Sequence, residues 1–88
     1  MTERAVTVTN PLGVHARPSA LLVQTASKFQ SDIWFVKDGQ EVNGKSMLGV
    51  MTLAAEMGST VVIRANGPDE ERAVEELAQI FAIKFDEN

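Results

Sequence analysis

Hydrophobic positions along the chain follow two periods, one typical of strands and one typical of helices. Segments in which polar residues alternate with β-branched or aromatic ones predict strands at residues 4–9, 31–37, 40–43 and 60–65. Segments in which apolar residues recur every three or four positions predict helices that begin near His15 or Ala16, after Ser46 and near Glu70. The resulting order, β-α-β-β-α-β-α, favours a two-layer α+β domain in which helices cover one face of an antiparallel sheet. The order of the strands does not follow from this pattern.

Breakers and caps set the boundaries of these elements. Pro18 is compatible with a helix only in the first turn, which fixes the start of the first helix near His15 or Ala16. Asp38-Gly39 is typical of a two-residue hairpin turn. Ser46 is a good N-cap for a helix over 47–55, which we expect to stop at Met57-Gly58.

Several conspicuous side chains have a structural interpretation. Trp34, the only tryptophan, is expected to pack in the core or on a sheet face. The acidic residues of the last helix are interpreted as a solvated face; they are Glu70, Glu71, Glu75 and Glu76. The inner face of the same helix is expected to consist of Ala73, Val74, Leu77, Ile80, Phe81 and Phe85.

Composition narrows the class of protein. The 88 residues fit one domain spanning 1–88, and a 44% apolar content is ordinary for a folded protein. The net charge of −4 argues against a general nucleic-acid binder, which needs a surplus of lysine and arginine. The chain has no cysteine, no segment of membrane-spanning length and no signal-peptide core, so we expect a cytoplasmic protein without membrane insertion.

The single histidine lies where the first helix is predicted to begin. The start of a helix presents unpaired N–H groups and a partial positive charge, which together favour a bound phosphate. The same field disfavours a protonated imidazole, and a neutral ring keeps a nucleophilic lone pair. Arg17 is suited to hold phosphoryl oxygens, and Gly13 allows close approach of backbone. These features predict transient phosphorylation of His15; the alternative is a capping or surface histidine without chemistry. With one histidine and no triad partner, the sequence predicts neither a metal site nor a hydrolytic site.

The motif "GVHARP" at 13–18 resembles the phosphorylation site of the histidine-containing phosphocarrier (HPr) family of the bacterial sugar phosphotransferase system. "NGKSMLGVMTLAA" at 43–55 and "GPDEERAVEEL" at 67–77 extend the resemblance over essentially the whole chain. The resemblance implies an open-faced β-sandwich whose four antiparallel strands have the order 1-4-2-3, with three helices on one face.

The resemblance also implies a phosphoryl relay. His15 would accept the group, through Nδ1 in this family, from enzyme I, which is charged by phosphoenolpyruvate, and would pass it to an EIIA-type protein. Arg17 would be the charge partner of the phosphate, while Gly13 and Pro18 would shape the site. Such a carrier needs no cofactor and is not a stand-alone enzyme. We expect a monomer, because one face must stay accessible to two partners.

Ser46 has two compatible interpretations. As an N-cap it contributes about 1 kcal/mol to helix stability. The resemblance implies in addition a regulatory phosphorylation by an HPr kinase/phosphorylase. A phosphate there would add a charge of about −1.5 to −2 beside the docking face and would repel acidic partners.

The helix after Ser46 is apolar on more sides than a core requires. Val50 and Leu53 share a face suited to the core, whereas three larger apolar residues point elsewhere. Either methionine fills gaps in a small core, or the helix carries an adaptable docking patch. The residues expected to bind partners are Ala16, Ala20, Lys45, Met47, Leu48 and Met51, with Lys45 and Arg17 as a basic rim.

Three other assignments stay open or are set aside. Ala16 replaces the hydroxyl residue of many members, and the ending "KFDEN" resembles the nitrogen-related branch, NPr, which uses the same histidine in a regulatory relay. The second alternative is a small ligand- or partner-binding module without phosphate chemistry. The catabolite-repression homologue that carries only the serine is excluded as a close match, because it lacks the histidine.

Overall fold

The computed structural model describes residues 1–11, 13–53 and 55–82, and its elements follow the predicted order. The strands are β1 (Thr2–Thr7), β2 (Asp32–Lys37), β3 (Gln40–Asn43) and β4 (Thr60–Asn66). The helices are α1 (Ala16–Ala26), α2 (Met47–Thr52) and α3 (Glu70–Ala82). None of these helices offers a stretch long and apolar enough to span a bilayer.

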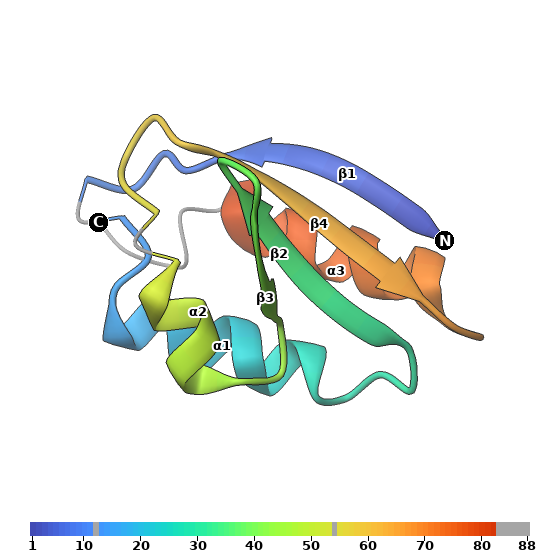
Figure 1. Cartoon of the computed structure of the whole chain (residues 1–88). Helices are drawn as coiled ribbons and strands as arrows, with labels where there is room; N and C mark the ends of the chain where they lie inside the picture. The colour runs from blue at the N-terminus through green and yellow to red at the C-terminus, as the bar shows by residue number, and fades with distance from the viewer. Residues whose placement is uncertain (12, 54, 83–88) are drawn as a thin grey trace.

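The four strands form one antiparallel sheet in the order β1-β4-β2-β3, so the order that the resemblance implied is confirmed. Helices α1 and α3 lie behind the sheet in Figure 1, while α2 packs at its edge against α1 and β3. The two central strands, β4 and β2, are far apart in the sequence and pair in register, with Phe35 opposite Ile63.

The core fills the space between the sheet and the helices. Alternate residues of β2 and β4 point into it, among them Ile33, Phe35 and Ile63, each almost completely buried. Phe35 meets Phe81 of α3 edge to face, with ring centroids 6.3 Å apart. Trp34 lies on the opposite, open face and is half-buried, which confirms its predicted packing on a sheet face.

Two predicted boundaries were wrong. The first strand covers 2–7 rather than 4–9, because Val8 leaves the ladder and exchanges backbone hydrogen bonds with Gly58 and Ser59. The helix predicted over 47–55 ends at Thr52, where the Leu53 N–H turns back to the Val50 carbonyl, 3.3 Å away. Phe85, predicted on the inner face of the last helix, lies outside the described residues.

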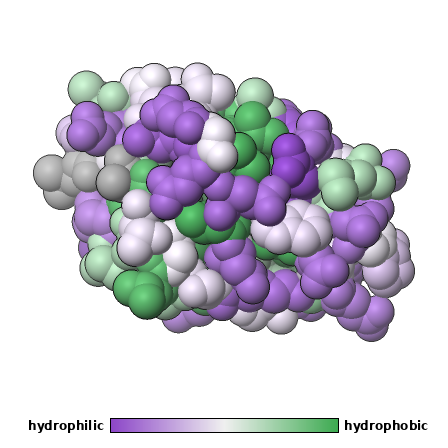
Figure 2. Space-filling view, in the orientation of Figure 1, coloured by the Kyte–Doolittle hydropathy of each residue, from purple (hydrophilic) through white to green (hydrophobic). Residues whose placement is uncertain are grey.

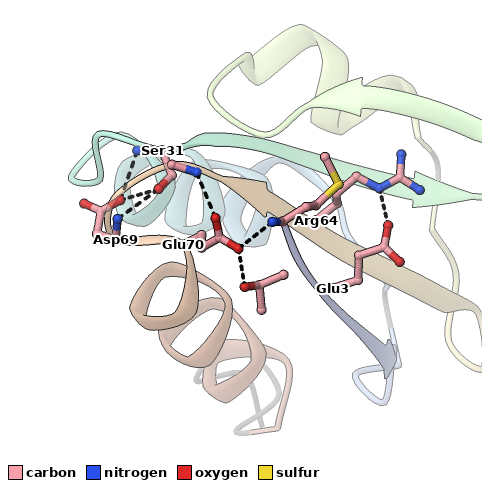
Figure 3. Close-up of polar contacts among 8 residues, drawn as sticks. Glu3, Ser31, Arg64, Asp69 and Glu70 are labelled. Carbon is pink, nitrogen blue, oxygen red and sulfur yellow. Dashed lines mark hydrogen bonds and ion pairs between the residues drawn. The ribbon is translucent and has the colours of Figure 1, made fainter.

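The start of α3 is tied to the loop before β2. The Asp69 carboxylate accepts hydrogen bonds from the N–H groups of Gln30 and Ser31, each at 3.0 Å, and from the Ser31 hydroxyl (Figure 3). These hydrogen bonds lower the pKa of Asp69 to about 2, and the bond from the Ser31 hydroxyl has the largest effect. Asp69 therefore fixes where α3 begins relative to β2.

Glu70 is not part of a purely solvated face, so that interpretation was wrong for this residue. Its carboxylate accepts the Thr2 hydroxyl at 2.5 Å and the Gly67 N–H at 3.2 Å, and it lies 2.9 Å from the terminal amine (Figure 3). The bond from Thr2, followed by that from the amine, lowers the pKa of Glu70 to about 2. Glu71 and Glu75 are exposed, as predicted.

Candidate functional site

His15 is the N-cap of α1. Its backbone is extended, with φ −99° and ψ −163°, and its carbonyl accepts the Ser19 N–H at 2.9 Å. The predicted helix start is confirmed, and Pro18 is the third helical residue, where its missing N–H removes no helical bond. His15 is half-buried and directly precedes the first turn with its unpaired N–H groups, and its side chain makes no capping hydrogen bond to them.

The charges around this helix start favour an anion. No acidic side chain lies in the first turn of α1, so no carboxylate there offsets the positive end of the helix dipole. Arg17 is exposed and, within the described part of the chain, forms no salt bridge. Its guanidinium is therefore available to an anion bound at the imidazole.

Gly13 occupies a position that only glycine fits. Its φ is +68°, and a Cβ on it would lie 2.5 Å from the Ala55 carbonyl oxygen. In this structure the close backbone approach is to Ala55. The Val14 N–H donates to the same carbonyl at 2.8 Å.

Asn10 is a buried part of the site that the sequence interpretation missed. Its side chain is completely buried, and its amide Nδ2 donates to the Gly13 carbonyl at 2.5 Å. The only signal in the sequence was the Asn-Pro pair, which indicates a turn without indicating burial.

Ser46 is the N-cap of α2, as predicted. Its backbone is extended, and its Oγ accepts the Gly49 N–H at 3.1 Å. The side chain is half-buried. Ser46 therefore has a structural role as the N-cap of α2.

Helix α2 presents apolar side chains to solvent. Val50 is fully buried, whereas Leu48 is 75% and Met51 43% exposed. Met47 is half-buried. The prediction that these large residues point away from the core is thus confirmed for Leu48 and Met51, and Figure 2 shows hydrophobic side chains at the surface over α2. Because α2 packs against α1, this patch and the helix that begins at His15 lie together (Figure 1).

The remaining predicted partner residues differ in exposure. Ala16 is exposed and Ala20 half-buried on α1. Lys45 is half-buried, and its ammonium donates to the Phe29 carbonyl at 2.7 Å, so it links the end of the α1 region to the start of α2. Among the described residues no group of three or more side chains is arranged to hold a metal ion.

The sequence and the fold of this chain are similar to those of known proteins. A family model described as the PTS HPr component phosphorylation site matches residues 2–82. A phosphocarrier protein HPr of Xylella fastidiosa is 49% identical over 88 residues, which are 100% of this chain and 99% of that protein. The crystal structure of HPr-C-His from Thermoanaerobacter tengcongensis has a TM-score of 0.96 at 46% identity and covers 100% of this chain and 99% of that chain. The chain therefore belongs to the HPr family of the phosphotransferase system.

The expectation that the catabolite-repression homologue is no close match was wrong. The crystal structure of Crh from Bacillus subtilis, described as a dimer with a swapping domain, is 44% identical and has a TM-score of 0.75. The match covers 93% of this chain and 94% of that chain. That expectation depended on the histidine alone, whereas overall similarity reflects the many positions that build a fold.

Proposed function

We propose that this chain carries phosphoryl groups in the sugar phosphotransferase system. His15 accepts the group from phosphorylated enzyme I, which phosphoenolpyruvate charges, and passes it to an EIIA-type protein. The observation that carries this proposal is the position of His15 as N-cap of α1, with no carboxylate in the first turn and with Arg17 exposed and without a salt bridge among the described residues.

The proposed transfer balances without a cofactor. A lone pair of the imidazole forms a bond to phosphorus while the bond between phosphorus and the donor breaks. The other ring nitrogen keeps its proton. The dianionic group then lies against the N–H groups of the first turn, and Arg17 holds its oxygens. Transfer to the acceptor repeats the exchange with His15 as the leaving group.

We assign docking to the apolar patch formed by Leu48 and Met51 of α2, together with Ala16, Ala20 and Met47 beside it. Leu48 and Met51 carry this assignment because they are exposed apolar side chains on the helix that packs against α1. A phosphate on Ser46, added by an HPr kinase/phosphorylase, would place a charge of about −1.5 to −2 at the N-cap of this helix and weaken binding of acidic partners.

Reconstitution of the relay tests the proposal. The chain is incubated with enzyme I, magnesium and phosphoenolpyruvate, then with an EIIA-type acceptor, and phosphate is followed on each protein. A second series replaces the donor by the enzyme of the nitrogen-related branch, and the faster donor identifies the branch. A chain that accepts phosphate from neither donor would favour the alternative of a binding module.

We also propose that the carrier is a cytoplasmic monomer, since both partners would use the same α1 and α2 face. Sedimentation at micromolar concentration tests the oligomeric state. A stable dimer, such as the one described for Crh, would contradict it. Fractionation of cells tests the location.

A further inference from the structure

The backbone immediately before His15 is held from two sides. On one side the buried Asn10 amide donates to the Gly13 carbonyl at 2.5 Å, and the Gly13 N–H donates back to the Asn10 carbonyl at 3.1 Å. On the other side the Val14 N–H donates to the Ala55 carbonyl at 2.8 Å. The Gly13–Val14 peptide unit, one residue before His15, is thus bonded through both its carbonyl and its N–H to groups outside α1.

The segment that holds Val14 is itself fixed. The Ser59 N–H donates to the Glu56 carbonyl at 2.9 Å, and the Ser59 hydroxyl accepts the Glu56 N–H at 3.0 Å. The same turn is bonded to Val8, the residue that follows β1, which exchanges backbone hydrogen bonds with Gly58 and Ser59 at 2.7 and 2.9 Å. The Ala55 carbonyl is therefore held in place by a turn anchored to the sheet.

There is no space for Gly13 to move toward this turn. A Cβ at Gly13 would lie 2.5 Å from the Ala55 oxygen and 3.0 Å from the Glu56 Cα. Both obstacles are backbone atoms, which cannot rotate away as a side chain would. A methyl group at Gly13 must therefore displace the backbone that leads into His15.

We propose that Asn10 and the Ala55 carbonyl are positioning groups for His15: they fix the Gly13–Val14 backbone so that the imidazole lies correctly against the first turn of α1. This inference rests on the proposed function of His15 as phosphoryl acceptor. Transfer between proteins depends on aligned reacting atoms, and a displacement of about 1 Å costs on the order of 10²-fold in rate.

The first test compares Gly13→Ala with Gly39→Ala. Both glycines have positive φ, +68° and +79°, so alanine meets similar backbone strain at each. A Cβ at Gly39, in the β2–β3 turn, has no atom within 4 Å, so this variant lacks the collision. We expect Gly13→Ala to lower the maximal rate of phosphorylation by enzyme I about 10- to 100-fold, with KM for this chain changed by less than about threefold, because the α2 patch is unaltered. Gly39→Ala should keep the wild-type rate within about twofold.

The second test removes the other side of the support. Asn10→Asp keeps the shape of the side chain but places an oxygen where Nδ2 donates to the Gly13 carbonyl. We expect the same split, a lower maximal rate with KM nearly unchanged. Circular dichroism and thermal unfolding check that each variant is folded. Because the chain has one histidine, its imidazole NMR signals report the position of His15 directly, and they should shift in both variants and not in Gly39→Ala.

The outcomes separate this inference from the proposed function. The positioning role would be overturned by a folded Gly13→Ala variant that is phosphorylated as fast as Gly39→Ala. It would also be overturned by a Gly13→Ala variant whose KM rises while its maximal rate stays unchanged. If Asn10→Asp fails to fold, the comparison of Gly13→Ala with Gly39→Ala decides. If the wild-type chain accepts no phosphate, the proposed function fails, and unshifted imidazole signals in Gly13→Ala would then refute the positioning role independently.

Discussion

Removal of the Ser46 hydroxyl should destabilise the fold by a predictable amount. In Ser46→Ala the Gly49 N–H loses the acceptor that now lies 3.1 Å away. Loss of an N-cap of this kind costs about 1 kcal/mol, within a range of roughly 0.5–2. Because Val50 of the same helix is fully buried, loosening of α2 also disturbs packing in the core.

The size of the effect in a melting experiment follows from the length of the chain. For 88 residues the unfolding entropy is about 0.18 kcal/mol per kelvin, so 1 kcal/mol lowers Tm by about 5 °C. Urea unfolding followed by the fluorescence of Trp34, the only tryptophan, gives the same free energy independently.

Two matched variants sharpen the measurement. Ser46→Asp keeps a capping oxygen and should stay within about 0.5 kcal/mol of wild type, while carrying a negative charge of the kind that we propose weakens binding of acidic partners. Ser27→Ala removes an exposed hydroxyl from the C-cap of α1, where the backbone N–H makes the capping bonds, and should be neutral within about 0.5 kcal/mol. Equal stability of Ser46→Ala and wild type, or equal losses in Ser46→Ala and Ser46→Asp, would refute the capping argument.

Three further outcomes are expected. Leu22→Ala empties a position that is 1% exposed, so urea unfolding should show a loss of about 2–5 kcal/mol, and a loss below about 1 would contradict the described core. Leu48→Ser changes a 75% exposed side chain; stability should stay within about 0.5 kcal/mol. Its KM in transfer should rise about fivefold, and an unchanged KM would exclude Leu48 from the docking patch. Stability should fall as pH drops from about 5 toward 2, because folding lowers the pKa values of Asp69 and Glu70 from 3.8 and 4.5 to about 2. Asp69→Asn should make the fall measured by urea unfolding shallower, and an equally steep fall would contradict that assignment.

The order of elements was predictable from the sequence because it depends on local patterns. Alternation identified β2 and β4, and Pro18 placed the start of α1 correctly. The order of the strands is set by pairing between distant segments, such as β1 with β4, and came only from the resemblance. The early end of α2 at Thr52 was not predicted, because Leu53 and Ala55 are apolar and buried although they lie outside the helix.

The features that were missed depend on the folded chain as a whole rather than on neighbouring residues in the sequence. Asn10 belongs to a turn in any interpretation, but its burial follows from the folded chain as a whole. Glu70 looked solvated because its partner Thr2 lies 68 residues away. The helix start near His15 and the capping role of Ser46 were predicted correctly, because the residues that define a helix start are its immediate neighbours in the sequence.

Phosphorylation of His15 is the claim on which the account depends, and mass spectrometry tests it most directly. The mass of the intact chain is measured after incubation with phosphoenolpyruvate, magnesium and either enzyme I or the enzyme of the nitrogen-related branch. The measurement is repeated after brief acid treatment, and His15→Ala is treated in the same way as a control. We predict one added phosphate that acid removes and that His15→Ala does not acquire. A phosphate that survives acid or persists in His15→Ala, or no phosphate on the folded wild-type chain with either donor, would contradict the assignment of His15 as the phosphoryl acceptor.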